Sequence, residues 1–158
     1  MDEKFKNLPL RIGVGIVVLH KENKIFVAKR IDNPKNFWQM PQGGVDDGEN
    51  FLEAAYRELE EETSIKNVKL IQEINETMIY ELPDHFLGII WKGKYKGQKQ
   101  KWFLMKFLGN DEEINIKTRK PEFLDWKWID VNMLTKVAVG FKLHIYKKLE
   151  VEIKKIIN

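Results

Sequence analysis

The chain has 158 residues, of which 43% are hydrophobic and 32% charged, with a formal net charge of +3. This length and balance predict a single domain over residues 1–158 with its own hydrophobic core. The sequence contains no cysteine, which excludes a disulfide scaffold, a thiol nucleophile and a cysteine-ligated zinc site. Only three histidines occur, so any bound metal should be a hard cation held by carboxylates.

No segment has the character of a membrane anchor or a signal peptide. The longest apolar stretch, residues 12–19, is far shorter than the roughly 20 residues that span a membrane. The first ten residues, MDEKFKNLPL, are charged and contain no apolar signal segment. We therefore expect no membrane association and a cytoplasmic location.

The first elements in chain order are two strands and a long loop. Residues 12–19 are rich in Val and Ile, which predicts a buried strand. A polar turn at 20–24 separates them from residues 25–29, which should be the second strand of a hairpin. Residues 30–50 hold two Pro and three Gly and should be mostly loop.

The next element is a helix over residues 51–63. Asn50 is a suitable N-cap, and Glu53 stands at the third helical position, as in a capping box. Apolar residues recur at helical spacing, namely Leu52, Ala55 and Leu59.

The second half of the chain predicts further strands and a terminal helix. Residues 68–80 resemble one long or bent strand, and 86–91, 100–108 and 126–129 three shorter ones. Residues 141–156 form an amphipathic helix. Its apolar face most simply packs on the sheet, with a dimer interface as the alternative, so the oligomeric state stays open. The order of elements predicts an α+β fold, a mixed sheet flanked by helices.

Three carboxylates gather on one face of the helix at 51–63. Glu58, Glu61 and Glu62 are spaced i, i+3 and i+4, so they are neighbours on its surface and repel one another. Such a cluster indicates either a solvated helix face or a site for a hard divalent cation such as Mg²⁺ or Mn²⁺. The loop before the helix, with Gly43, Gly44 and other turn residues, permits a tight path whose backbone N–H groups can face an anion.

These residues together resemble the Nudix box, the family pattern GX5EX7REUXEEXGU, in which U is a bulky apolar residue. The positions filled here are Gly43, Glu49, Arg57, Glu58, Leu59, Glu61, Glu62 and Ile65. Ser64 stands where the pattern has Gly. That Gly ends the helix, so a positive φ at Ser64 would cost roughly 1 kcal/mol without changing the chemistry.

The resemblance implies a fold, a reaction class and a set of roles. Nudix enzymes have an α/β/α sandwich and hydrolyse a nucleoside diphosphate linked to another group. By resemblance, Glu58, Glu61 and Glu62 would bind Mg²⁺, with Mn²⁺ as an alternative, and Glu58 and Glu62 would be catalytic. Arg57 would support catalysis by orienting Glu49 or a metal-ligating glutamate.

Other segments resemble one subgroup, which contains RNA pyrophosphohydrolases and asymmetric dinucleoside polyphosphate hydrolases. They are residues 37–44 (FWQMPQGG), 97–103 (GQKQKWF), 121–128 (PEFLDWKW) and 139–146 (VGFKLHIY). The resemblance therefore runs over nearly the whole chain. It implies that Glu122 is a fourth metal ligand or the general base.

The subgroup also implies substrate contacts. Arg11 and Arg30 match positions that contact RNA or its phosphates, and Gly43 and Gly44 would offer backbone contacts. Lys99 and Lys101 can bind a 5′-triphosphate electrostatically. Phe141 is the candidate for stacking on a base.

The implied activity is metal-dependent removal of pyrophosphate, or orthophosphate, from RNA 5′ ends, which leaves a 5′-monophosphate. The enzymatic alternative is hydrolysis of diadenosine tetra- or pentaphosphate. A Nudix-fold binding module without catalysis would need a broken metal site, which the intact glutamates disfavour. A structural acidic helix in an unrelated fold would require the match to the box to be a coincidence.

Overall fold

A computed structural model describes residues 3–32 and 35–157, so the two ends of the predicted domain lie outside the described residues. This part of the chain forms a seven-stranded sheet in the order β4-β6-β1-β2-β7, with β3 paired to β1 and β5 to β6. β1 and β6 are parallel and the other pairs antiparallel, so the predicted mixed sheet is confirmed. The strands are β1 (Leu10–Leu19), β2 (Lys24–Arg30), β3 (Gln42–Gly44), β4 (Val68–Glu73), β5 (Met78–Glu81), β6 (Gly97–Phe107) and β7 (Phe123–Asp130).

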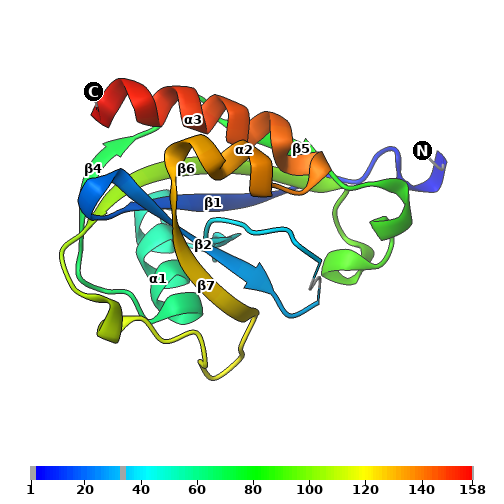
Figure 1. Ribbon diagram of the computed structural model, residues 1–158. Helices are drawn as coiled ribbons and strands as arrows, with labels where there is room; N and C mark the ends of the chain where they lie inside the picture. The colour runs from blue at the N-terminus through cyan, green and yellow to red at the C-terminus, as the bar shows by residue number, and fades with distance from the viewer. Residues whose placement is uncertain (1–2, 33–34, 158) are drawn as a thin grey trace.

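Helices cover both faces of the sheet, because its central strands are apolar on both sides (Figure 1). On β1, Val14, Ile16 and Val18 join the core beneath α1 (Phe51–Thr63). The alternate residues Val17 and Leu19 join the opposite core, beneath α2 (Leu134–Val137) and α3 (Leu143–Ile157). The predicted α/β/α sandwich is therefore confirmed.

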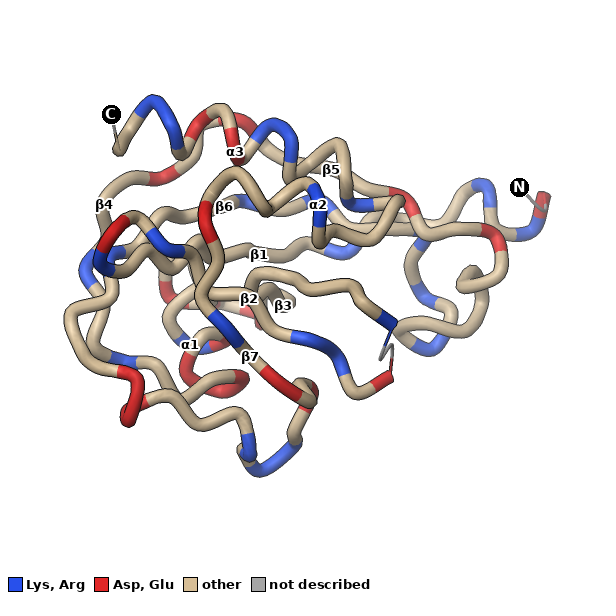
Figure 2. Tube along the Cα trace, viewed as in Figure 1, with Lys and Arg blue, Asp and Glu red and all other residues tan. Residues whose placement is uncertain are grey.

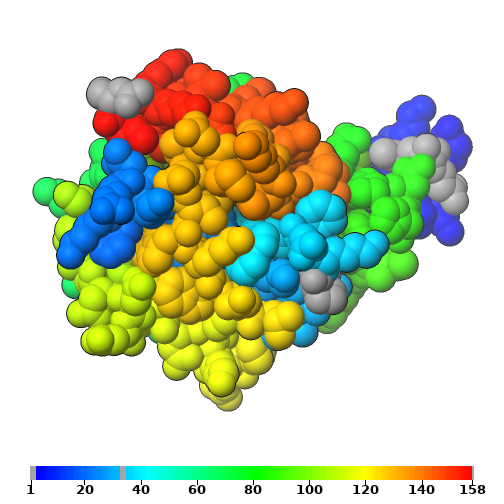
Figure 3. Space-filling view, viewed as in Figure 1, coloured from blue at the N-terminus to red at the C-terminus, as the bar shows by residue number. Residues whose placement is uncertain are grey.

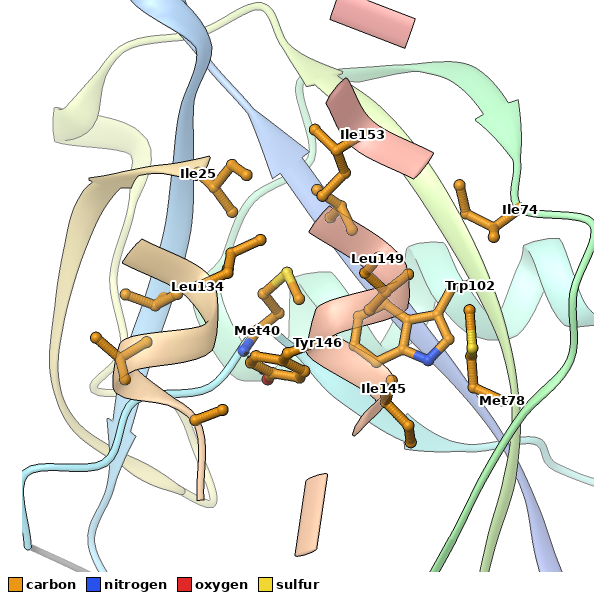
Figure 4. Close-up of a cluster of buried hydrophobic side chains, with 14 of the residues drawn as sticks. Ile25, Met40, Ile74, Met78, Trp102, Leu134, Ile145, Tyr146, Leu149 and Ile153 are labelled. Atoms are coloured by element: carbon orange, nitrogen blue, oxygen red, sulfur yellow. Dashed lines mark hydrogen bonds between the residues drawn. The ribbon is translucent and has the colours of Figure 1, made fainter. Parts of the chain in front are cut away.

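The terminal helix packs on the sheet, which is the simpler of the two roles predicted for its apolar face. Its buried residues Ile145, Tyr146, Leu149 and Ile153 belong to one core cluster with Trp102 of β6, and Tyr146 and Leu149 lie beside the Trp102 ring (Figure 4). Trp102 is fully buried, and burial of a side chain of that size dominates the energy of such a core.

Helix α1 begins and ends as the sequence predicts. The Asn50 Oδ1 atom accepts a hydrogen bond from the Glu53 backbone N–H at 2.8 Å, and the Asn50 amide in turn donates to the Glu53 carboxylate. At the other end Ser64 adopts a left-handed conformation, φ 66°, and its N–H donates to the Glu60 carbonyl. The expected positive φ at Ser64 is confirmed.

The loop before α1 is tied to the opposite layer of the sandwich. The Met40 N–H donates to the Tyr146 hydroxyl at 2.7 Å, and the Trp38 N–H donates to the Val137 carbonyl. In the space-filling view this loop (cyan) lies directly beside α2 (orange) (Figure 3). The anchored loop continues into β3, which pairs with β1 and is an element that the predicted loop at 30–50 did not include.

Two predictions about strands were wrong. Residues 68–80 form two strands, because both β4 and β5 pair with β6 and residues 74–77 turn between them. Residues 86–91 form no strand but belong to two 3₁₀ turns, at Asp84–Phe86 and Ile90–Gly93. Here Gly88 has φ +80° and Trp91 has φ 55°, and such positive φ values are incompatible with an extended strand.

The other boundaries shift by a few residues. β6 and β7 extend beyond the predicted ranges 100–108 and 126–129 toward their N-terminal ends, and the terminal helix begins after a 3₁₀ turn at Gly140–Lys142. No helix within residues 3–32 and 35–157 is long and apolar enough to cross a membrane.

Candidate active site

Four carboxylates form one wall of a cavity of about 530 Å³. Three come from α1, and the fourth stands just before β7. Figure 2 shows both groups as red segments on α1 and around the start of β7. We call them the acidic wall, which consists of Glu58, Glu61, Glu62 and Glu122. The structure therefore brings together all four predicted metal ligands.

Arg57 organises the helix side of this wall through one guanidinium group. Its Nε and Nη2 atoms donate to the two oxygens of Glu49 at 2.7 and 2.9 Å. Its Nη1 atom donates to Glu58 at 2.9 Å and to Glu61 at 3.2 Å. Nη2 also donates to the Gly44 carbonyl at 2.9 Å. Only the planar, five-donor fork of arginine can satisfy all of these acceptors together.

The bonds from Arg57 also fix the charge of Glu49. They lower the pKa of the Glu49 carboxyl to about 2, so this group is ionised at neutral pH. Arg57 thus connects α1 to the loop before it, consistent with the positioning role that the sequence predicts.

The two glycines of this loop allow close approach. A Cβ atom on Gly43 would lie 2.1 Å from the Glu58 carboxyl carbon, and one on Gly44 would lie 2.4 Å from the Arg11 guanidinium. Real Cβ atoms do not approach that closely, so any larger residue at these positions would displace the Glu58 carboxylate or the Arg11 guanidinium. Gly43 lines the cavity itself, whereas Gly44 contributes its carbonyl to Arg57.

Burial makes the charge of the acidic wall costly. Glu62 is only 5% exposed, and burial, then the charges of Glu122 and Glu58, raise its pKa well above the ordinary value. Burial likewise raises the pKa of Glu58. The Oε2 atom of Glu62 is buried without a hydrogen-bond partner.

These features fit a hard divalent cation, since the donors are all carboxylates and one buried oxygen lacks a partner. Among residues 3–32 and 35–157, no three acidic or histidine side chains already surround a single point. Arg57 donates to one oxygen each of Glu58 and Glu61, and Glu58 also interacts with Glu62. A bound cation would draw oxygens of these carboxylates around one point.

Comparison with known proteins decides the family. The sequence model of the NUDIX domain matches residues 9–149. The chain belongs to the Nudix family. Glu49 in the loop before α1, together with Arg57, Glu58, Glu61 and Glu62 on the helix, therefore forms a Nudix box in its proper structural context.

Individual relatives agree with this assignment. The chain is 66% identical to an RNA pyrophosphohydrolase of Pelagibacter ubique over 158 residues, which is 100% of both chains. Among solved structures it resembles an E. coli dihydroneopterin triphosphate pyrophosphohydrolase, with a TM-score of 0.72, 21% identity and coverage of 91% and 99%. It also resembles a C. elegans Ap4A hydrolase, with a TM-score of 0.67, 24% identity and coverage of 92% and 99%. At these identities the two structures demonstrate the Nudix fold alone.

The cavity is also lined by basic and aromatic side chains, as the subgroup resemblance implies, and the Arg30 Nη1 atom lies 3.9 Å from the Glu122 Oε2 atom of the acidic wall. Arg11, Arg30 and Phe141 all line the cavity. The guanidinium carbon of Arg11 lies over the Trp91 ring, 5.3 Å from the ring centroid. The ring centroids of Phe141 and Tyr80 are 5.7 Å apart. Arg30 donates two hydrogen bonds to Asp32, which hold its guanidinium at the cavity edge.

Lys142 is a cavity residue to which the sequence analysis assigned no role. It is buried beside Arg30 and the acidic wall, and burial together with the Arg30 charge lowers its pKa to about 7. Its Nζ atom lies 3.4 Å from the Gln39 Oε1 atom and 5.3 Å from the Tyr80 ring centroid. It follows Phe141 in the segment that carries the resemblance, but only the fold reveals its burial.

The structure does not bring Lys99 and Lys101 to this cavity. On β6 their side chains alternate with Gln98 and Gln100 and therefore point to the other face of the sheet. Lys99 is exposed, and Lys101 lies 3.6 Å from Glu73. The expectation that these lysines grip the phosphates is therefore not supported by their position.

The buried glutamines of β6 take part in the site instead. Gln98 accepts a hydrogen bond from the Tyr80 hydroxyl at 2.9 Å and donates to the Gly43 carbonyl. Gln100 donates to Gln42. This network fixes β3, which carries the two glycines, against β6.

Proposed function

We propose that this Nudix chain is a metal-dependent RNA pyrophosphohydrolase that converts a 5′-triphosphate end to a 5′-monophosphate. The oxygen of a water molecule forms a bond to the α-phosphorus. The bond from that phosphorus to the α–β bridging oxygen breaks, and pyrophosphate leaves with the electron pair. The water protons pass to a base or to solvent. A diphosphorylated end would release orthophosphate by the same step.

One observation carries the proposal. The acidic wall lines the same cavity as three cationic side chains and a stackable ring. A polyphosphate needs positive charge, and the first bases of single-stranded RNA need an aromatic surface. The cavity offers positive charge and an aromatic surface beside the glutamates of the Nudix box, which suit a metal.

The acidic wall would hold Mg²⁺, with Mn²⁺ as the alternative, through Glu58, Glu61, Glu62 and Glu122. When bound, the cation neutralises phosphate charge and lowers the pKa of nearby water. Glu122, which comes from a different element than its three companions, would act either as the fourth ligand or as the general base. Arg57 acts through the glutamates that it holds.

The basic and aromatic residues of the cavity would bind the substrate. Arg11, Arg30 and Lys142 would contact the phosphates, and an anion would favour the protonated form of Lys142. Phe141, which is partly exposed beside Tyr80, would stack on a base. Gly43 would leave room for the phosphate chain beside Glu58.

The Pelagibacter relative is 66% identical to this protein over the full chain, and its name, RNA pyrophosphohydrolase, supports RNA as the substrate. An RNA substrate also favours action in the cytoplasm, where transcripts are made. The alternative substrate is a dinucleoside polyphosphate, whose hydrolysis needs the same chemistry. A hydrolysis assay with both substrates distinguishes the two activities.

The test is hydrolysis of a short 5′-triphosphate RNA and of diadenosine pentaphosphate with Mg²⁺. Glu62→Gln should lower turnover at least about 100-fold, whereas Glu53→Gln, on the exposed first turn of α1, should not. Faster cleavage of RNA by the wild type is the expected result. Faster cleavage of the dinucleotide would favour the alternative. Equal rates for the wild type and Glu62→Gln on both substrates would contradict the catalytic assignment.

A further inference from the structure

A second cavity lies behind the acidic wall. Its volume is about 800 Å³, and it is lined by all four residues of the wall together with the end of α1 and the loop before β7. The wall therefore separates two cavities, and a cation held by it would be reachable from both. The further residues that line the second cavity are Glu60, Ser64, Lys66, Thr118, Arg119 and Lys120.

Three of these residues are exposed cations, which we call the basic rim: Lys66, Arg119 and Lys120. In Figure 2 the loop before β7 carries blue segments that lie below the red ones of α1. Within the described ranges 3–32 and 35–157, the basic rim makes no ion pair, although it shares its cavity with the acidic wall. These cations therefore do not serve to neutralise the glutamates.

Two residues that line the second cavity also carry buried polar atoms without hydrogen-bond partners. These atoms are the Oγ1 atom of Thr118 and the Oε2 atom of Glu62. A buried polar group without a partner is costly, and a ligand that supplies the missing bond removes that cost. The hydroxyl can donate to an anion, and the carboxylate can bind a cation that accompanies it.

Apart from the acidic wall that they share, each of the two cavities is lined by three cationic side chains and one carboxylate. The first cavity has Arg11, Arg30 and Lys142 against Asp32. The second has the basic rim against Glu60. Positive charge thus lies on each side of a wall that suits a cation, which is the arrangement that a polyphosphate chain crossing the wall requires.

We infer that the second cavity is a leaving-group site, in which the basic rim and Thr118 bind the pyrophosphate end of a triphosphate substrate. The inference rests on the proposed function and adds a second half to its site. The nucleoside and α-phosphate lie on the side of Phe141, the scissile bond lies at the wall, and the outer phosphates lie beyond it. After the α–β bond breaks, the electron pair and negative charge stay with pyrophosphate, whose charge the basic rim offsets.

The kinetic test compares leaving groups. Arg119→Ala/Lys120→Ala removes two exposed cations of the rim, and Lys147→Ala/Lys155→Ala removes the same charge from α3 in the opposite layer. The rim variant should lose about tenfold in kcat/KM on triphosphorylated RNA, the loss that follows from one charge-assisted contact. It should lose less than about threefold on diphosphorylated RNA, because that substrate lacks the outermost phosphate. Equal losses on both RNAs, or no loss, would overturn the inference.

A binding test separates failure of this inference from failure of the proposed function. Inorganic pyrophosphate with Mg²⁺ is titrated into each protein by calorimetry, with no RNA present. The rim variant should bind pyrophosphate about tenfold more weakly than the wild type and the α3 variant do. Equal affinity in all three proteins would overturn the leaving-group site even if RNA is cleaved. Absence of RNA cleavage by the wild type, with the affinity difference present, would overturn the proposed function and leave the pyrophosphate site standing.

Discussion

The burial of Lys142 makes the stability of the protein depend on pH. The pKa of the lysine falls from 10.5 to about 7 on folding, mainly through burial. Between those two values the folded protein binds fewer protons than the unfolded chain, so the free energy of unfolding rises with pH across that window. Below about pH 7 the lysine is charged in both states, and the cost of burying it is constant.

Lys142→Met should therefore stabilise the protein while it weakens phosphate binding. The variant keeps the length of the side chain and removes the buried charge. Its advantage in melting temperature should be largest below pH 7 and should shrink as pH rises toward 10.5, while kcat/KM on triphosphorylated RNA falls at least about tenfold. Melting curves from pH 6 to 10 check this. An advantage that is independent of pH would show that the buried amine is not the cause.

Single residues also mark where sequence reasoning succeeds and fails. The spacing of Glu58, Glu61 and Glu62 could be converted to a common helix face, because an α-helix has a fixed period. Lys99 and Lys101 were placed at the site because their charge suits a phosphate. The face of the sheet to which a strand side chain points depends on pairing partners that are distant in the sequence. In the structure it is Gln98 and Gln100, and not the two lysines, that point toward the site. The burial of Lys142 had no local signal at all.

At the level of elements, the end of α1 combines two opposing contributions. Ser64 has φ 66°, which costs about 1 kcal/mol for a residue other than glycine. Its hydroxyl donates to the Asn115 carbonyl at 2.9 Å, a bond worth about 1 kcal/mol. The departure from the glycine of the Nudix pattern is thus compensated by a bond to the loop before β7.

Two substitutions at this position separate the contributions. Ser64→Ala keeps the strained backbone and loses the hydroxyl, so it should lower the free energy of unfolding by about 1 kcal/mol. Ser64→Gly loses the hydroxyl and also the strain, so it should change stability by less than about 0.5 kcal/mol. Urea denaturation measures both. An alanine variant as stable as the glycine variant would mean that the backbone strain contributes nothing.

The predicted elements that proved wrong share one physical cause. Both the division of β4 from β5 and the turns at 84–93 depend on how a chain segment meets β6 and the cavity, which no short window of sequence contains. A short apolar run such as 86–91 is compatible with a strand or with turns that cover a core. The helix α1 was predicted closely because its cap, its apolar spacing and its acidic face all lie within fifteen residues.

The whole molecule places the acidic wall where its two layers and two cavities meet. α1 and the loop before β7 supply the carboxylates, and the opposite layer anchors the glycine loop through Met40 and Tyr146. Burial and the mutual repulsion of these carboxylates raise the pKa values of Glu58 and Glu62, so ionising the whole wall costs free energy in the folded protein. A ligand that binds only the folded protein and offsets this repulsion stabilises the entire fold.

Addition of Mg²⁺ should therefore raise the melting temperature in a saturable way. At a concentration one hundred times the dissociation constant, linkage gives a stabilisation of about 2.7 kcal/mol. Glu62→Gln should lose most of this shift, since Glu62 supplies the buried oxygen that lacks a partner, and Glu53→Gln should keep it. Sodium chloride at the same ionic strength is the control for screening, and EDTA should reverse the effect. An equal Mg²⁺ shift in Glu62→Gln and the wild type would place the cation elsewhere, because repulsion at the wall would then have no part in its binding.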